Sequence, residues 1–65
     1  MEKSEMIDLA KKAIRKSWNF EDLKYGDDMY GKESLAHEVW DFVEECKLIG
    51  TKAFDEKYPK PQNSA

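Results

Sequence analysis

Two stretches of the chain carry apolar residues at helical spacing, and this pattern restricts the fold more than any other feature. Between Met6 and Trp18, apolar and small side chains share one half of a helical wheel, while charged side chains share the other half. Between Leu35 and Ile49, a second apolar stripe lies opposite an acidic face. Each stripe has to be covered by other apolar side chains, so we expect an all-α fold, either a small helical hairpin or a three-helix domain.

The first helix is predicted over residues 5–18. Ser4 is its expected N-cap, because a serine hydroxyl can accept a hydrogen bond from a free first-turn amide. Continuing the helix past Asn19 would place Leu23 among charged residues and break the amphipathic phase. We therefore predict a new N-cap at Asn19 and one short helical turn over residues 20–25.

Glycines punctuate the next part of the chain. Gly26 is expected to end the short turn by adopting a positive φ, and residues 27–31 are expected to form a loop. The second long helix should begin near Lys32 or Glu33. The connection between the two long helices is long enough for an antiparallel return, with the short helical turn packed across the pair.

Gly50 leaves two interpretations open. The second helix continues through Gly50, or it ends there and Thr51 caps a third helix that reaches about Tyr58. We favour continuation, because Phe54 and Tyr58 extend the apolar stripe without a change of phase. An internal glycine costs about 1 kcal/mol relative to alanine, which tertiary packing can offset.

The domain boundary is expected just before the prolines at positions 59 and 61, which end regular structure. Residues 1–58 should form a single helical domain, and the polar residues 59–65 a disordered tail. Four large aromatic residues are expected to supply the main mass of the core. They are Trp18, Trp40, Phe42 and Phe54.

Charge and cysteine usage exclude several classes of protein. Residues 1–18 hold five basic and three acidic side chains, whereas residues 19–46 hold two basic and nine acidic ones. An acidic middle argues against a simple nucleic-acid binder, which usually has a basic excess. Cys46 is the single cysteine and no apolar run is long enough to cross a membrane. We therefore expect a cytoplasmic protein that is not inserted in a membrane.

A ladder of ionisable residues on the second helix is the strongest hint of a chemical site. Glu33, His37, Asp41 and Glu45 follow one another at four-residue spacing. A single helix supplies at most two ligands to one ion, so we interpret the ladder as a solvated helix face. Cys46 lies in the centre of the apolar stripe, away from the only histidine, and is expected to be a buried structural residue. No catalytic residue, metal site or cofactor is therefore predicted, and we do not expect an enzyme.

The favoured function is a non-catalytic protein-interaction module, acting as an adaptor, inhibitor or regulator of another protein. Its contact surface would combine the acidic face of the second helix with the aromatic loop before it. The predicted contact residues are Tyr25, Asp27, Asp28, Met29, Tyr30, Glu38, Asp41, Glu44 and Glu45. Tyrosine and methionine are suited to such contacts because large side chains dominate interface hot spots.

Two alternatives remain open from the sequence. A dimeric nucleic-acid-binding regulator would use a basic strip on the first helix, formed by Lys11, Lys12, Arg15 and Lys16. We consider pairing of this strip with the acidic face of the second helix, within or between chains, the better interpretation. A homodimer that covers exposed parts of the apolar stripes is the other alternative, because so short a chain builds only a thin core.

Overall fold

A computed structural model describes residues 1–59 of the chain, and in this range it confirms an all-α fold without strands. The elements are α1 (Lys3–Arg15), α2 (Phe20–Lys24), the 3₁₀ turns η1 (Asp27–Met29) and η2 (Glu33–Leu35), α3 (Ala36–Ile49) and α4 (Thr51–Lys57). Apart from Pro59, the predicted disordered tail over residues 59–65 lies outside the described residues.

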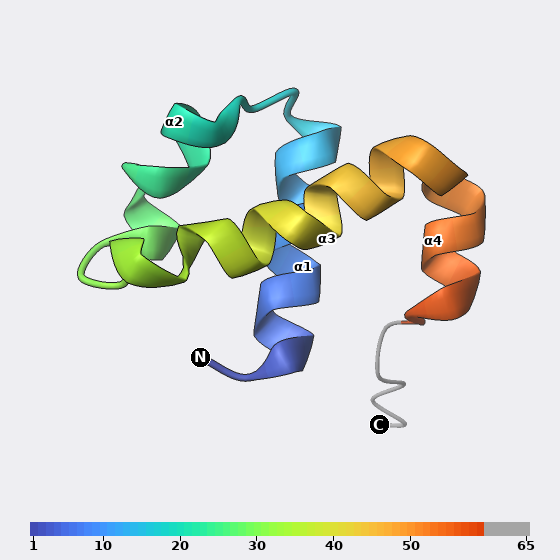
Figure 1. The fold of residues 1–65 in the computed structure, drawn as a ribbon, viewed down its shortest axis with the longest axis horizontal. Helices are drawn as coiled ribbons and strands as arrows, with labels where there is room; N and C mark the ends of the chain where they lie inside the picture. The colour runs from blue at the N-terminus through green and yellow to red at the C-terminus, as the bar shows by residue number, and fades with distance from the viewer. Residues whose placement is uncertain (60–65) are drawn as a thin grey trace.

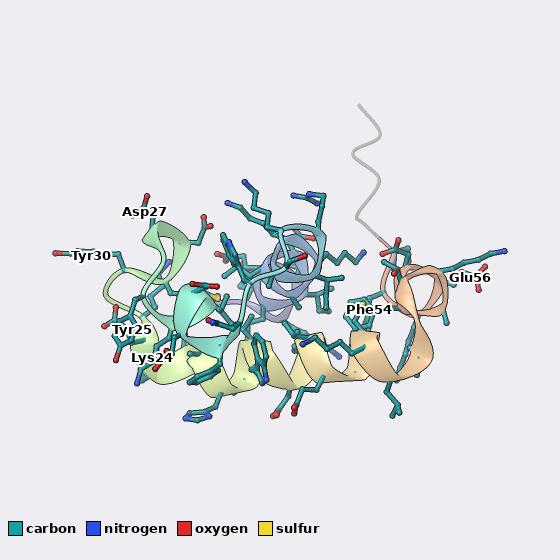
Figure 2. The ribbon with its side chains drawn as sticks, turned by 90° about the horizontal axis from the view of Figure 1, so that it is seen from above. Lys24, Tyr25, Asp27, Tyr30, Phe54 and Glu56 are labelled. Atoms are coloured by element: carbon teal, nitrogen blue, oxygen red, sulfur yellow. The ribbon has the colours of Figure 1, made fainter. Side chains whose placement is uncertain are left out.

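All the other helices of the described residues pack against α3. In Figure 1, α1 crosses behind α3 at a steep angle, α2 and η1 lie beside the N-terminal half of α3, and α4 turns away from its C-terminal end. The two long helices therefore do not form the antiparallel pair expected from the sequence. Seen from above in Figure 2, α1, α2 and α4 all lie on the same side of α3.

Small side chains make the crossing of α1 and α3 close. Ala10 and Ala13 of α1 are fully buried in one cluster with Ala36, Val39 and Val43 of α3. Alanine at such a contact lets two helix backbones approach at a crossing point, where ridges of one helix fit the grooves of the other. The position of this contact decides which face of α3 is covered.

The core is built from fewer aromatic residues than the sequence suggested. Phe54 is fully buried, but Trp18, Trp40 and Phe42 are only partly buried and lie at the edges of the core. The centre of the core is instead occupied by Leu23 and Met29, which are fully buried, and by the alanine and valine side chains where α1 crosses α3. This core cluster consists of Ala10, Ala13, Leu23, Met29, Ala36, Val39 and Val43.

A second apolar cluster joins α4 to the crossing. It consists of Ile7 from α1, Cys46 from α3 and Phe54 from α4. Tyr58 packs on this cluster, with 5.0 Å between the centroids of its ring and the Phe54 ring. The two clusters give α1 neighbours on both of its flanks, α2 with η1 on one and α4 on the other.

Helix α1 begins earlier and ends earlier than predicted. Glu2, and not Ser4, is its N-cap, and the backbone amide of Glu2 donates a hydrogen bond to the Glu5 carboxylate at 3.4 Å. At the other end, the amides of Ser17 and Trp18 donate to carbonyls of the last turn, at 3.1 and 2.9 Å. This pair of bonds is a Schellman motif, and Ser17 accordingly adopts φ +58°.

The short helix after Asn19 is confirmed, with a reciprocal cap. The Asp22 amide donates to Asn19 Oδ1 at 2.7 Å, and the Asn19 amide donates to Asp22 Oδ2 at 3.0 Å. The prediction that Gly26 adopts a positive φ is wrong, because its φ is −76°. It is followed by the 3₁₀ turn η1, where a loop was expected. The positive φ values belong to Ser17, Gly31 and Gly50.

Gly50 ends α3, so the expected continuous helix is wrong. Its φ of +95° and ψ of 153° lie in a region that essentially only glycine adopts. Gly50 is both the last cap of α3 and the first cap of α4, and Thr51 is already helical. The break at Gly50 turns α4 back, so that Phe54 packs in one cluster with Cys46 of α3 and Ile7 of α1. In a straight helix, Phe54 would lie about two turns beyond Cys46 and out of reach of α1.

We expect Gly50→Ala to lower the free energy of unfolding by about 1–3 kcal/mol, because a Cβ atom strains this backbone conformation. The added atom would meet nothing within 4 Å, so backbone strain is the only cost. Thermal and urea unfolding followed by circular dichroism measures the change. Thr51→Ala, one residue later and exposed, is the control and should change stability by less than about 0.5 kcal/mol. Equal stability of the two variants would contradict the assigned break.

Ser17→Gly should have the opposite effect and stabilise the protein by roughly 0.5–1 kcal/mol. Glycine removes the steric cost of a left-handed residue at the end of α1, which exceeds the entropy that glycine adds to the unfolded chain. Ser17→Val is the matched comparison and should destabilise, since a β-branched residue fits φ +58° poorly. The order Gly, Ser, Val in melting temperature is the expected result, and the reverse order would disprove the Schellman end.

Candidate protein-binding surface

The face of α3 that points away from α1 is not covered by any other element within residues 1–59 (Figure 2). Four exposed residues define this α3 outer face: Glu38, Asp41, Glu44 and Leu48. At 100° per residue they fall within one third of the helix circumference, opposite the buried residues Ala36, Val39 and Val43. Three of the nine predicted contact residues thus share a single surface.

Leu48 is the residue of this surface that the sequence interpretation missed. It is 85% exposed, although a leucine in a helix next to the core is usually buried. It lies seven residues after Asp41 and four after Glu44, so it belongs to the same face as these two carboxylates. That spacing is visible in the sequence, and it would have identified Leu48 as an apolar residue on the polar side.

The acidic residues of α3 divide into paired and unpaired ones. Glu45 accepts hydrogen bonds from Lys57 Nζ and, at 3.1 Å, from the Tyr58 hydroxyl, so it connects α3 to the end of α4. The bond from Lys57 lowers the pKa of Glu45, with burial opposing and Tyr58 adding to the effect. Among residues 1–59, by contrast, no salt bridge involves Glu38, Asp41 or Glu44. Glu45 is therefore a structural residue more than a free contact residue.

The predicted aromatic loop is only partly a surface. Tyr25 and Tyr30 are 71% and 87% exposed, and Figure 2 shows both near Asp27, at the end of the molecule where α3 begins. Met29 is fully buried in the core, so its predicted contact role is wrong. Asp28 forms a 2.6 Å salt bridge with Lys12.

Within the chain, the basic strip of α1 pairs with Asp28 and Asp55 and not with the acidic face of α3, while the expected pairing between chains stays a prediction. Lys11 is 11% exposed, and its Nζ donates to the Tyr58 carbonyl at 2.7 Å and approaches Asp55 at 3.3 Å. Lys12 is held by Asp28, as described above. Arg15 and Lys16 are exposed and form no salt bridge within residues 1–59. Two of the four cations proposed for nucleic-acid contact thus serve to attach η1 and α4 to α1.

The ionisable groups do not assemble into a reactive centre in the part of the chain that the structure describes. No group of three or more histidine, cysteine or carboxylate side chains there is placed to hold a metal ion. Burial raises the pKa of the Cys46 thiol, which keeps it protonated and poorly nucleophilic at neutral pH. His37 is exposed and contacts the Phe20 ring at 4.9 Å between centroids.

Comparisons with known proteins do not add a relative. No family model matches the chain, and no curated protein or solved structure is significantly similar to it. A membrane-spanning helix is also not found, because every helix within residues 1–59 is too short or too polar to cross a bilayer.

Glu45→Gln should make the stability of the protein less dependent on acid pH. The pKa of Glu45 in the folded state lies below its ordinary value of 4.5, so its stabilising effect is complete above that value and disappears as the pH falls through the lowered pKa. We therefore expect wild type to melt above the variant near neutral pH, with the difference closing in acid.

The measurement is a series of thermal melts between acid and neutral pH. Glu38→Gln also removes one carboxylate of α3, but one without a salt bridge in the described residues, and should shift the melting temperature little at neutral pH. A Glu45→Gln difference that persists unchanged in strong acid would show that the stabilisation does not depend on the ionised Glu45 carboxylate and its pairing with Lys57.

Proposed function

We propose that this chain is a non-catalytic interaction module that binds another protein through the α3 outer face. The observation that carries the proposal is Leu48, an almost fully exposed leucine beside carboxylates that have no salt bridge in residues 1–59. Within residues 1–59 the other elements cover the opposite side of α3, which leaves this face available to a partner as far as these residues are concerned. Binding would let the module act as an adaptor, inhibitor or regulator.

The chemistry of the face specifies the kind of partner. Burying a leucine side chain contributes about 1.5–3 kcal/mol, which is the size of a typical interface hot spot. The carboxylates around Leu48 add little affinity when they remain exposed, but they accelerate encounter with a positively charged surface. The matching partner surface is an apolar pocket with lysine or arginine side chains at its rim.

The exposed tyrosines supply a second contact area at the other end of α3. Tyr25 and Tyr30 lie by the start of the helix, while Leu48 lies near its end. With a rise of 1.5 Å per residue, α3 is roughly 20 Å long, which a partner of ordinary interface size can span. Tyr25 and Tyr30 would then widen the interface around the leucine anchor.

Reversing the charge of the α3 outer face should abolish partner capture. We expect the double variant Asp41→Lys, Glu44→Lys to lose the proteins that tagged wild type retains from a lysate of the native host. Leu48→Ala should retain at least roughly tenfold less of them, because the apolar anchor is removed. Capture is quantified by mass spectrometry, and circular dichroism checks that helicity is unchanged.

The control carries the same change of net charge elsewhere. Glu21 and Glu56 are exposed acids of α2 and α4, outside the α3 outer face. The double variant Glu21→Lys, Glu56→Lys should retain the same partners as wild type. If the two double variants behave alike, the α3 outer face is not the contact surface.

A further inference from the structure

An open groove lies between α1 and α4, on a different surface from the α3 outer face. Its volume is about 800 Å³. The groove is lined by Asp8, Lys11, Lys12, Ile14, Arg15, Thr51, Asp55 and Pro59. It thus combines apolar surface from Ile14 and Pro59 with three of the four cations of the basic strip.

The positive charge lies at one end of the groove, because Asp8 also lines it without a salt bridge in residues 1–59, and the net positive charge comes from Arg15 with the adjacent Lys16. Lys11 and Asp55 form a salt bridge across it, and Lys12 is paired with Asp28, whereas Arg15 forms no salt bridge in residues 1–59. Lys16 follows directly at the end of α1 and is likewise exposed. An occupant with carboxylates and an apolar side chain would complement the groove.

We propose that the α1–α4 groove binds the α3 outer face of a second copy of this chain. This inference rests on the proposed function, because it uses the same face and names the partner. The second copy presents Asp41 and Glu44 to Arg15 and Lys16, and Leu48 to the apolar surface at Ile14. Residues 60–65 do not match the groove in this way, since Lys60 is their only charged side chain.

The contact can form only between molecules. Figure 2 shows α1 and α4 on one side of α3, and the α3 outer face points to the other side. A chain therefore cannot place its own α3 outer face in its own groove. Asp41 and Leu48 are seven residues apart on α3, or roughly 10 Å, and the groove residues Asp8 and Arg15 are also seven residues apart on α1, so the two surfaces are similar in length.

The association is head-to-tail. Each copy uses its groove for one neighbour and its α3 outer face for another, so assembly does not stop at the dimer and produces a distribution of sizes. A symmetric contact between two α3 outer faces would instead bring like charges together. Because exposed charges carry much of the attraction, salt should dissolve the assemblies, as the Debye length falls to about 3 Å at 1 M ionic strength.

Complementation between two variants of the full chain tests the proposal. In the groove variant, Arg15→Ala and Lys16→Ala remove the cations. In the face variant, Asp41→Lys and Glu44→Lys reverse the carboxylates. Sedimentation equilibrium at low salt should show size increasing with concentration for wild type, monomers for each variant alone, and a one-to-one complex for their mixture. The mixture stops at a dimer because a groove without its cations does not attract the lysines of the reversed face, so only one groove and one face remain compatible.

Adding Leu48→Ala to one partner at a time excludes simple attraction between oppositely charged proteins, because net charge stays the same. In the groove variant the leucine is used, so the affinity of the mixture should fall about tenfold or more. In the face variant the leucine is not used, and the same substitution should have no effect. Equal effects in both partners would overturn the proposal.

Two other results would also overturn it. One is a wild-type chain that stays monomeric up to millimolar concentration at low salt, and the other is a mixture that stays monomeric. If these occur while Asp41→Lys, Glu44→Lys still abolishes capture of host proteins, only the homotypic contact is disproved and the proposed function stands. If wild type assembles but Asp41→Lys, Glu44→Lys does not change the capture of host proteins, binding of a different protein through the α3 outer face is disproved instead.

Discussion

The close contact of α1 with α3 is the packing interaction on which the rest of the structure depends. Ala10 and Ala13 lie in one buried cluster with Ala36 and Val39, and these small side chains let the contact bury one side of each helix. Leu23 and Met29 complete the cluster on one flank of α1, and Phe54 fills the other. Because α1 occupies a single side of α3, the same contact that builds the core also creates the uncovered face.

The break at Gly50 completes this arrangement and changes the surface at the same time. It directs α4 back toward α1, where Lys11 reaches the Tyr58 carbonyl and Asp55. It also brings Lys57 to Glu45, which turns a solvated carboxylate into a connection between α3 and α4. Leu48, two residues before the break, receives no such neighbour and stays exposed. The backbone conformation of Gly50 thus allows Glu45 to pair with Lys57 and leaves Leu48 exposed.

After the internal pairs are counted, the α3 outer face and the end of α1 carry charges of opposite sign. Carboxylates without salt bridges in residues 1–59 remain along α3, while Arg15 and Lys16 remain at the end of α1, on the other side of the crossing. Surface ion pairs contribute little to stability, so this separation matters more for association than for folding. It makes the proposed binding face negative and the end of α1 beside the α1–α4 groove positive.

The sequence by itself determined the features that depend on residues close in the chain. Helical periodicity identified the long helices, and Asn19 with Asp22 identified the short one, because a capping box involves only neighbouring residues. It also placed Glu38, Asp41 and Glu44 on one helix face. The tertiary structure alone decided that Trp18 and Trp40 lie at the edge, that Met29 lies inside, and that Glu45 and Asp28 are paired. These outcomes depend on which segments meet across the crossing and across Gly50, and periodicity along one helix contains no information about a partner helix.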